Sequence, residues 1–176
     1  MLIKTIFAGF GGQGVLSMGL NLTQAAMLEG KNVTYLPSYG AEVRGGTANC
    51  TVAISDEEIA SPVASSPDFV VAMNQPSLVR FQNQVESGGV VFLNSSLIEA
   101  EISRGDIDIV RVPANTIAEE IGGPRSANMV MLGVFAKKSN LVSLSSLIEA
   151  MSSTLKNKGK LMAINKKALM TGYDLF

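Results

Sequence analysis

A cluster of four glycines near the start of the chain has the residue types and spacing of an anion-binding turn. The apolar residues 5–8 are followed by GFGGQG at positions 9–14 and then by an apolar pattern with helical spacing. This order is typical of a strand, a tight turn and a helix. The first amides of such a helix have no partner within it, and the positive end of the helix dipole lies behind them. The segment therefore predicts a site for an anion, most often a phosphate. The candidate residues are Gly9, Gly11, Gly12, Gln13 and Gly14.

The rest of a dinucleotide-binding unit is missing. Such a unit places Asp or Glu at the end of its second strand, about 20 residues after the turn, to bind the ribose. The second predicted strand, residues 32–36, leads into Pro37 and Ser38, and the first carboxylate is Glu42. Gln13-Gly14-Val15 also occupies the place of a P-loop lysine. The pattern therefore favours a phosphate cradle over a nicotinamide site, and a tight turn without a ligand stays open as the structural alternative.

A polar, glycine-rich loop is predicted over residues 37–46. Its glycines let a backbone or a flat ligand approach closely. Arg44 can hold a phosphate, or the carboxylate of a partner, with two hydrogen bonds. The alternative is an ordinary surface pair of Glu42 with Arg44, which contributes little energy. The candidate residues of this loop are Ser38, Tyr39, Gly40, Glu42, Arg44, Gly45 and Gly46.

Polar residues also follow the later predicted strands. Asn74 comes directly after residues 68–73, residues 94–96 (Asn-Ser-Ser) follow 90–93, and Asn115 follows 109–112. In parallel sheets ligands bind at the carboxyl ends of the strands, so all of these residues are expected at one rim. Asn74 joins the candidate binding residues. For residues 94–96 and Asn115, ordinary turn formation is the favoured interpretation.

Two absences limit the chemistry of the chain. It contains no histidine and a single cysteine, Cys50. A Ser-His or Cys-His nucleophile pair therefore cannot form within it, and one cysteine cannot hold a cluster or a structural zinc. Because Cys50 lies in the alternating run 47–54, we expect a small buried strand residue. No catalytic residue and no metal ligand is predicted in this chain.

The composition points to a subunit of a larger assembly. Charged residues make up 16% of the 176 residues, against about a quarter in a typical protein. The net charge is −1, so no affinity for nucleic acid or for a membrane surface is expected. No apolar run approaches the roughly 20 residues of a membrane span. The first residues are too short for a signal peptide, and a cytoplasmic location is predicted.

Alternating strands and helices predict an α/β fold over residues 1–176. We expect a single doubly wound, mostly parallel sheet with helices on both faces, and an antiparallel strand at or near its edge over residues 47–55. The other strands are predicted at residues 5–8, 32–36, 68–73, 90–93 and 109–112. Helices are predicted at about 15–29, 76–82, 114–121, 127–138 (capped by Ser126) and 144–156 (capped by Ser143), with a weakly helical tail over 165–176.

Four segments together resemble one protein family. They are GFGGQG at 9–14, SYGAEVRGG at 38–46, SPDFVVAMNQPS at 66–77 and GGPRSANMVMLG at 122–133. The chain resembles the gamma subunit of 2-oxoacid:ferredoxin oxidoreductases over nearly its whole length. The resemblance implies that a complex converts a 2-oxoacid, coenzyme A and oxidised ferredoxin to acyl-CoA, carbon dioxide and reduced ferredoxin.

The resemblance also implies which subunits bind the cofactors. Thiamine diphosphate, magnesium and iron–sulfur clusters belong to partner subunits, namely alpha, beta and delta, and ferredoxin accepts the electrons. This chain is then a scaffold that binds no cofactor alone but can share coenzyme A, with residues 11–14 and Arg44 as candidates for its phosphates. The pattern is most similar to the 2-oxoglutarate branch, and branched-chain 2-oxoacids and pyruvate stay open. The alternative is a stand-alone nucleotide- or phosphate-binding module with a regulatory role.

Overall fold

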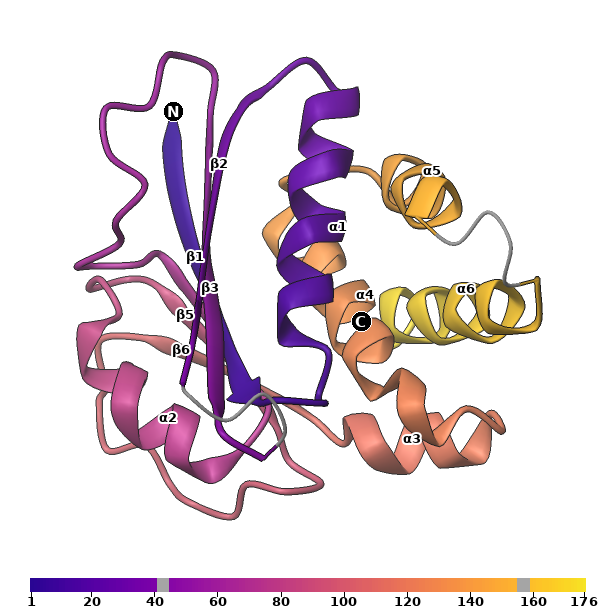
Figure 1. Cartoon of the computed structure of the whole chain (residues 1–176). Helices are drawn as coiled ribbons and strands as arrows, with labels where there is room; N and C mark the ends of the chain where they lie inside the picture. The colour runs from indigo at the N-terminus through magenta and orange to yellow at the C-terminus, as the bar shows by residue number, and fades with distance from the viewer. Residues whose placement is uncertain (41–44, 155–158) are drawn as a thin grey trace.

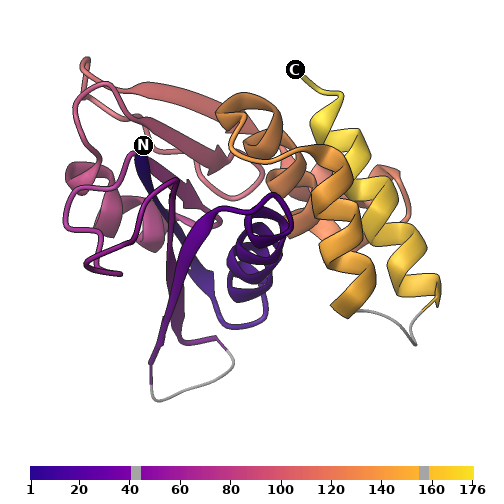
Figure 2. The same ribbon diagram turned by 90° about the horizontal axis from the view of Figure 1, so that it is seen from above.

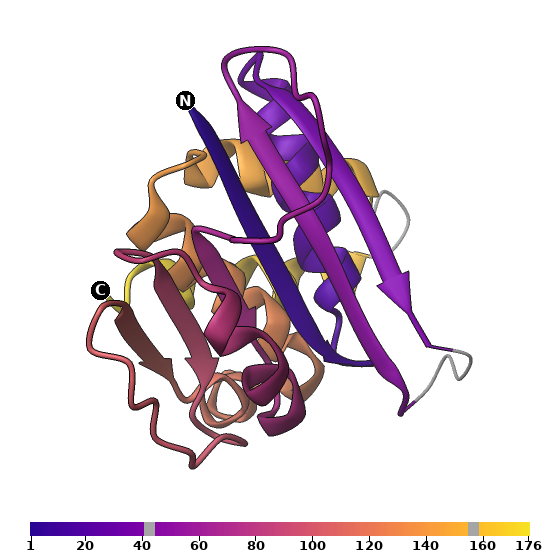
Figure 3. The same cartoon turned by 90° about the vertical axis from the view of Figure 1, so that its left-hand side faces the viewer.

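Six strands form one sheet in the part of the chain that the structure describes. The structure is a computed structural model, and it describes residues 1–40, 45–154 and 159–176. The strands lie side by side in the order β2-β3-β1-β4-β5-β6, and Figure 3 shows the face of this sheet. Their bounds are β1 Leu2–Phe10, β2 Asn32–Tyr39, β3 Thr47–Ser55, β4 Phe69–Ala72, β5 Val90–Asn94 and β6 Asp108–Val112.

Helices cover both faces of this sheet, unequally. The helices are α1 Val15–Leu28, α2 Gln75–Phe81, α3 Ala114–Glu120, α4 Ala127–Ser139, α5 Leu144–Thr154 and α6 Gly159–Tyr173. Two short 3₁₀ turns are η1 Gln82–Gln84 and η2 Pro124–Ser126. Figure 1 shows α2 on one side of the sheet and α1, α4, α5 and α6 on the other, and Figure 2 shows the same layers from above. The predicted α/β fold with helices on both faces is confirmed.

Strand directions bring five carboxyl ends to one edge of the sheet. β1, β4, β5 and β6 are parallel neighbours. β3 runs antiparallel to both β1 and β2, with Phe10 opposite Thr47 and Tyr39 opposite Ala48. β2 therefore runs in the direction of β1. The predicted antiparallel strand over residues 47–55 is confirmed, and it lies second from the edge.

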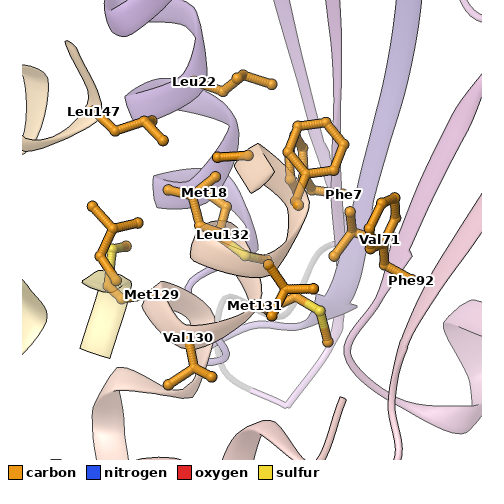
Figure 4. Close-up of a cluster of buried hydrophobic side chains, with 14 of the residues drawn as sticks. Phe7, Met18, Leu22, Val71, Phe92, Met129, Val130, Met131, Leu132 and Leu147 are labelled. Carbon is orange, nitrogen blue, oxygen red and sulfur yellow. The ribbon is translucent and has the colours of Figure 1, made fainter. Parts of the chain in front are cut away.

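Alternating side chains divide the core into two layers. Phe7, Val71 and Phe92 face α1 and α4, whereas their strand neighbours Ile6 and Val70 face α2. This follows from the two-residue period of a strand. Figure 4 shows the larger layer, in which Phe7, Val71 and Phe92 approach side chains from α1 and α4. The strands are therefore packed against helices on both faces.

One aromatic side chain of α4 fixes that helix against the sheet. Phe135 is fully buried and lies edge-on to Phe7, Phe69 and Phe92, with ring-centre distances of 5.4, 5.6 and 5.3 Å. Edge-to-face pairs of this kind add about 0.5–1.5 kcal/mol each beyond their burial. These contacts pack α4, whose first turn borders the site described below, against the sheet.

The second strand is longer than predicted. Residues 37–39 were expected in a loop, but they continue β2, with Pro37 opposite Cys50 and Ser38 opposite Asn49. Proline is tolerated there because β2 is an edge strand. β1 is likewise longer than residues 5–8 at both ends. The predicted loop is therefore shorter than expected, because cross-strand pairing extends the ladder beyond the apolar residues.

The two predicted helix caps differ in outcome. Ser143 is confirmed, because its hydroxyl accepts a hydrogen bond from the amide of Ser146 at 3.2 Å. Ser126 precedes α4 but its side chain does not cap it. Its hydroxyl donates instead to Asn165 Oδ1 of α6 at 2.7 Å. The tail is also more helical than predicted, since α6 begins at Gly159. The predicted end of the helix over 144–156 lies outside the described residues.

None of the helices in the described parts of the chain combines the length and the apolar character needed to cross a membrane.

Candidate functional site

The glycine turn has backbone φ angles that residues with a side chain rarely adopt. Gly12 and Gly14 have φ angles of +102° and +73°, in the region that glycine adopts most easily. The turn is closed by a hydrogen bond from the Gln13 amide to the Phe10 carbonyl at 3.0 Å. Gly14 is the N-cap residue of α1 and provides no side-chain cap, and the first turn of α1 has no acidic residue. The positive end of α1 therefore lies next to an uncapped backbone.

Gln13 joins the ends of the two central strands. Its Oε1 accepts from the Phe10 amide at 2.7 Å and from Asn74 Nδ2 at 2.7 Å. Its Nε2 donates to the Met73 carbonyl at 3.2 Å. Gln13 thus connects the end of β1 to the end of β4. The sequence predicted this residue as a binding residue, and the structure adds a role in holding the rim together.

Side-chain amides continue this connection across the rim. Asn74 Oδ1 accepts from the Ser77 amide at 3.0 Å and caps α2. Asn94 Nδ2 donates to the Met73 carbonyl at 3.3 Å and to Asn115 Oδ1 at 2.7 Å. Asn94 also makes the predicted turn, because its Oδ1 accepts from the Ser96 amide. Turn formation is therefore only part of the role of these asparagines, which also link β4, β5 and α3.

The site lies where the chain reverses its direction of winding. From β1 the chain passes through α1 to β2, on one side of the sheet. From β4 it passes through α2 to β5, on the other side. The carboxyl ends of β1 and β4 are neighbours, with Ala8 opposite Ala72. In open α/β sheets ligands bind at such a switch point. The prediction that the polar clusters gather at this rim is confirmed for the described residues.

Two hollows adjoin the glycine turn. The first, which we call the turn hollow, has a volume of about 490 Å³ and is mainly apolar. It is lined by Phe10, Gly11, Gly12, Gly14, Val15, Leu16, Ser17, Tyr39 and Ala48. The second, which we call the switch crevice, has a volume of about 480 Å³ and is more polar. It is lined by Gly12, Gln13, Met73, Asn115, Pro124, Arg125, Ala127 and Asn128. Gly12 belongs to both.

The described ends of the predicted loop over residues 37–46 lie beside the glycine turn. The Gly11 amide donates to the Gly46 carbonyl at 2.8 Å, and the Gly45 amide donates to the Gly11 carbonyl at 3.3 Å. The Gly40 amide donates to the Thr47 carbonyl at 3.0 Å. Tyr39, whose exposed fraction is 65%, lines the turn hollow.

Two predicted residues of this loop, Glu42 and Arg44, lie outside the described residues. Ser38 lies on β2 opposite Asn49 and does not line either hollow. Arg125 and Asn128 also line the switch crevice. Neither was predicted as a site residue from the sequence, although both lie in the segment 122–133 that resembles the family.

Gly14 also fits closely against α4. Asn128 Nδ2 donates to the Gly14 carbonyl at 3.3 Å. A Cβ on Gly14 would collide with the Asn128 side chain. The amino ends of α1 and α4 are therefore held together directly behind the turn.

Cys50 is a buried structural residue, as predicted. It is fully buried, and its Sγ lies 3.5 Å from the Val15 carbonyl. Burial raises the pKa of the Cys50 thiol to about 12, and burial likewise raises the pKa of the neighbouring Tyr35 to about 12. The thiol is therefore protonated at neutral pH and unsuited to nucleophilic attack. Among the described residues no group of three His, Cys, Asp or Glu side chains could hold a metal ion.

Residues 4–175 match the pyruvate ferredoxin/flavodoxin oxidoreductase family. The chain is 44% identical, over 174 residues, to the ketoisovalerate oxidoreductase subunit VorA of Methanothermobacter thermautotrophicus, covering 98% of this chain and 36% of VorA. The 2-oxoglutarate synthase subunit KorC of Methanothermobacter marburgensis is 39% identical over 155 residues, covering 84% of this chain and 83% of KorC. The chain thus spans about a third of the length of VorA and most of the length of KorC.

Solved structures share the same fold. The gamma subunit of a keto/oxoacid ferredoxin oxidoreductase from Geobacter sulfurreducens superimposes with a TM-score of 0.83 at 27% identity, covering 98% of this chain and 96% of that one. The 2-oxoglutarate:ferredoxin oxidoreductase of Magnetococcus marinus, with 2-oxoglutarate, coenzyme A and succinyl-CoA bound, gives a TM-score of 0.90 at 25% identity, covering 99% of this chain and 31% of that one. These matches confirm the predicted resemblance to the gamma subunits. This chain belongs to the pyruvate ferredoxin/flavodoxin oxidoreductase family.

Proposed function

We propose that this chain is the gamma subunit of a multi-subunit, cytoplasmic 2-oxoacid:ferredoxin oxidoreductase and takes part in binding coenzyme A. The assembly oxidatively decarboxylates a 2-oxoacid, transfers the acyl group to coenzyme A and passes the electrons to ferredoxin. The observation that carries the coenzyme A role is the glycine turn at the uncapped amino end of α1.

The turn has the features that an anionic group of coenzyme A requires. Nothing lies within 4 Å of the position that a Cβ of Gly12 would occupy, so a ligand can approach the backbone closely there. The helix dipole of α1 favours negative charge at this place. The apolar wall of the turn hollow, which includes Phe10, Leu16 and Tyr39, suits an uncharged part of the same ligand.

The chemical steps belong to partner subunits in this proposal. The chain has no histidine, and its single thiol, Cys50, is buried and protonated at neutral pH. Thiamine diphosphate with magnesium, and iron–sulfur clusters, supply decarboxylation and electron transfer in the alpha, beta and delta subunits. The role of this chain is to close the assembly and to hold coenzyme A.

Exposed apolar side chains support a place within an assembly. On α1, Met27 and Leu28 have exposed fractions of 60% and 52%. On the edge strand β2, Leu36 and Tyr39 have exposed fractions of 41% and 65%. Apolar surface of this kind, together with a charged fraction of 16%, is typical of surfaces that other subunits cover.

The proposed 2-oxoacid is 2-oxoglutarate. The similarity to KorC, a 2-oxoglutarate synthase subunit, supports this choice. The similarity to VorA, a ketoisovalerate oxidoreductase subunit, keeps a branched-chain substrate as the competing candidate. The assembly should be assayed with 2-oxoglutarate, 2-oxoisovalerate and pyruvate, and the highest kcat/KM identifies the substrate. A preference for either of the other two acids would contradict the 2-oxoglutarate proposal alone.

Purification from the native source tests the gamma-subunit role. We expect larger chains that carry thiamine diphosphate and brown iron–sulfur clusters to accompany this one. The chain alone should be colourless and should reduce no dye with a 2-oxoacid, thiamine diphosphate and coenzyme A. If the chain purifies without partners yet binds a phosphorylated ligand, the stand-alone regulatory module replaces the proposal.

A further inference from the structure

The outer edge of β2 is unpaired in the described parts of the chain. β2 is the first strand in the sheet order, and β3 is its single neighbour there (Figure 3). The strand is eight residues long, carries no charged side chain and pairs with β3 without a bulge. Natural proteins usually protect a sheet edge with charges, bulges, prolines or a very short strand. β2 has Pro37 alone among these protections, so its edge can accept a further strand.

Hydrogen bonds to β3 show which backbone groups of β2 face outward. The Gly40 amide donates to the Thr47 carbonyl, so these two residues form a hydrogen-bonded pair. Such pairs alternate along an antiparallel ladder. The even-numbered residues of β2 therefore bond to β3, and the backbone groups of the odd-numbered residues point to the free edge. These residues are Val33, Tyr35, Pro37 and Tyr39.

The side chains of β2 form two rows, and both rows end in exposed apolar surface. Leu36 lies on the same face of the sheet as Ile6, the α2 side, and is 41% exposed. Tyr35 and Tyr39 lie on the α1 side. The Tyr35 hydroxyl donates to the Leu16 carbonyl at 3.2 Å, and Tyr39 lines the turn hollow. A strand added at this edge would therefore cover apolar side chains on both faces.

We propose that two copies of this chain pair through β2, antiparallel and about a two-fold axis at Leu36, so that their sheets join into one. At this register Val33 of each copy lies opposite Tyr39 of the other, and Tyr35 lies opposite Pro37. Each copy then donates from the outward amides of Val33, Tyr35 and Tyr39. Leu36 lies opposite its own copy in a pair without backbone hydrogen bonds, where side chains come closest. This interface goes beyond the proposed function and does not depend on coenzyme A.

The axis at Leu36 uses every outward amide, whereas the neighbouring registers do not. An axis at Tyr35 places Tyr39 beyond the end of the partner strand. An axis at Pro37 places two prolines opposite each other, where neither can donate. A second copy fits better than an unrelated strand, because two-fold pairing brings like residues together. Like charges would repel there, and residues 32–39 carry none.

The helices leave room for this pairing. Gly19 of α1 lies against Cys50 and Val52, so α1 crosses the sheet over β3. The β3 strands of the two copies would be separated by three strand spacings, or about 14 Å. Packed helices need only about 8–10 Å, so the two α1 helices would not collide. Tyr35 and Tyr39 of both copies would lie in the space between them.

Cysteine cross-linking of the full chain tests the partner. In Leu36→Cys the two introduced thiols lie opposite each other across the axis, within reach of a disulfide. Mild oxidation should therefore convert most of this chain to a dimer on a non-reducing gel. The native Cys50 is fully buried and takes no part. Val79→Cys is the matched control, because Val79 is exposed on α2, and this chain should stay monomeric on the gel.

A second pair of variants tests the register. Ser38 lies opposite Thr34 of the other copy in this arrangement, so the thiols of two Ser38→Cys chains would be four residues apart, or about 14 Å. Ser38→Cys alone should therefore not cross-link, whereas the double variant Thr34→Cys, Ser38→Cys should. Leu36→Lys places two ammonium groups opposite each other. Sedimentation equilibrium should give twice the mass of one chain for the wild type and the mass of one chain for Leu36→Lys.

Three results would overturn the proposal. The first is a wild-type chain that sediments as a monomer. The second is cross-linking in which Leu36→Cys and Ser38→Cys behave alike, because the register then has no effect. The third is a Leu36→Cys chain that, within the purified assembly, cross-links to a different subunit, because that subunit and not a second copy then covers β2. Each of these results leaves the coenzyme A role of the chain untouched.

Discussion

Replacing Gln13 tests whether one side chain holds the rim of the sheet together. Gln13→Ala removes three hydrogen bonds, with distances of 2.7, 2.7 and 3.2 Å. The Met73 carbonyl keeps its bond from Asn94, whereas the Phe10 amide and Asn74 Nδ2 each lose a partner. At about 0.5–1.5 kcal/mol for each bond, the loss of two to three bonds lowers the free energy of unfolding by about 1–4 kcal/mol.

Thermal unfolding of the full chain measures this loss. For a protein of this size, about 1 kcal/mol corresponds to a Tm change of roughly 2–4 °C, so Tm should fall by roughly 2–16 °C. Gln84→Ala is the matched control, because Gln84 is exposed and makes a single hydrogen bond, to the Arg80 carbonyl. Its Tm should change by less than 2 °C, since exposed substitutions usually stay within about 0.5 kcal/mol.

A second substitution separates the acceptor role of Gln13 from its donor role. Gln13→Glu keeps acceptors for Phe10 and Asn74 but turns the contact with the Met73 carbonyl into a repulsion between two oxygens. Its Tm should lie between those of the wild type and Gln13→Ala. The reasoning is refuted if Gln13→Ala unfolds at the same temperature as Gln84→Ala, because the side chain then contributes nothing to joining β1 and β4.

Three further substitutions or treatments have defined outcomes. Gly14→Ala should lower Tm more than Gly30→Ala, because both have positive φ angles but only a Cβ on Gly14 collides with Asn128; equal Tm values would show that the contact with α4 is unimportant. If Arg44 binds a phosphate, Arg44→Ala should raise the KM for coenzyme A by about 10- to 150-fold. If Arg44 instead pairs with a partner subunit, the same substitution should make the complex dissociate more easily in size-exclusion chromatography. An unchanged KM and an unchanged elution profile would indicate an ordinary surface pair with Glu42. Cys50 should resist thiol reagents at pH 8 until the chain is unfolded, and rapid labelling of the folded chain would contradict its burial. The free energy of unfolding should also fall as the pH rises from about 9 toward 12. The reason is that the thiol of the unfolded chain ionises first, while burial keeps the thiol of the folded chain protonated.

Local patterns were sufficient to predict most elements of the fold. The predicted strand over residues 47–55 has the same bounds as β3, because alternation of apolar and polar residues is a property of consecutive positions. The helix predicted at about 15–29 matches α1 within one residue, since a glycine bounds the pattern at each end. The glycine turn between β1 and α1 was predicted for the same reason. Asn74 was predicted at the rim because it directly follows a buried strand.

Other features depended on contacts between distant parts of the chain. β2 extends through Tyr39 because β3 pairs with it, which the apolar run over residues 32–36 did not indicate. Ser126 has the sequence position of a helix cap, but its hydroxyl donates a hydrogen bond to Asn165 of α6 instead of capping α4. Local propensity is a weak preference, and a tertiary hydrogen bond of similar energy can override it.

The motifs of the chain identified its family, and the alternation of strand and helix patterns identified its α/β class. The anion-binding role of the turn stays a prediction. The tertiary structure alone decided which residues surround that turn. Gln13 contacts Met73 across 60 positions, and Asn128 contacts Gly14 across 114. Arg125 lies in η2, directly before α4, and lines the switch crevice together with residues from the ends of β1 and β4. Spacing along a chain specifies neighbours within one helix or strand, whereas the meeting of separate loops at a rim depends on strand order and helix packing.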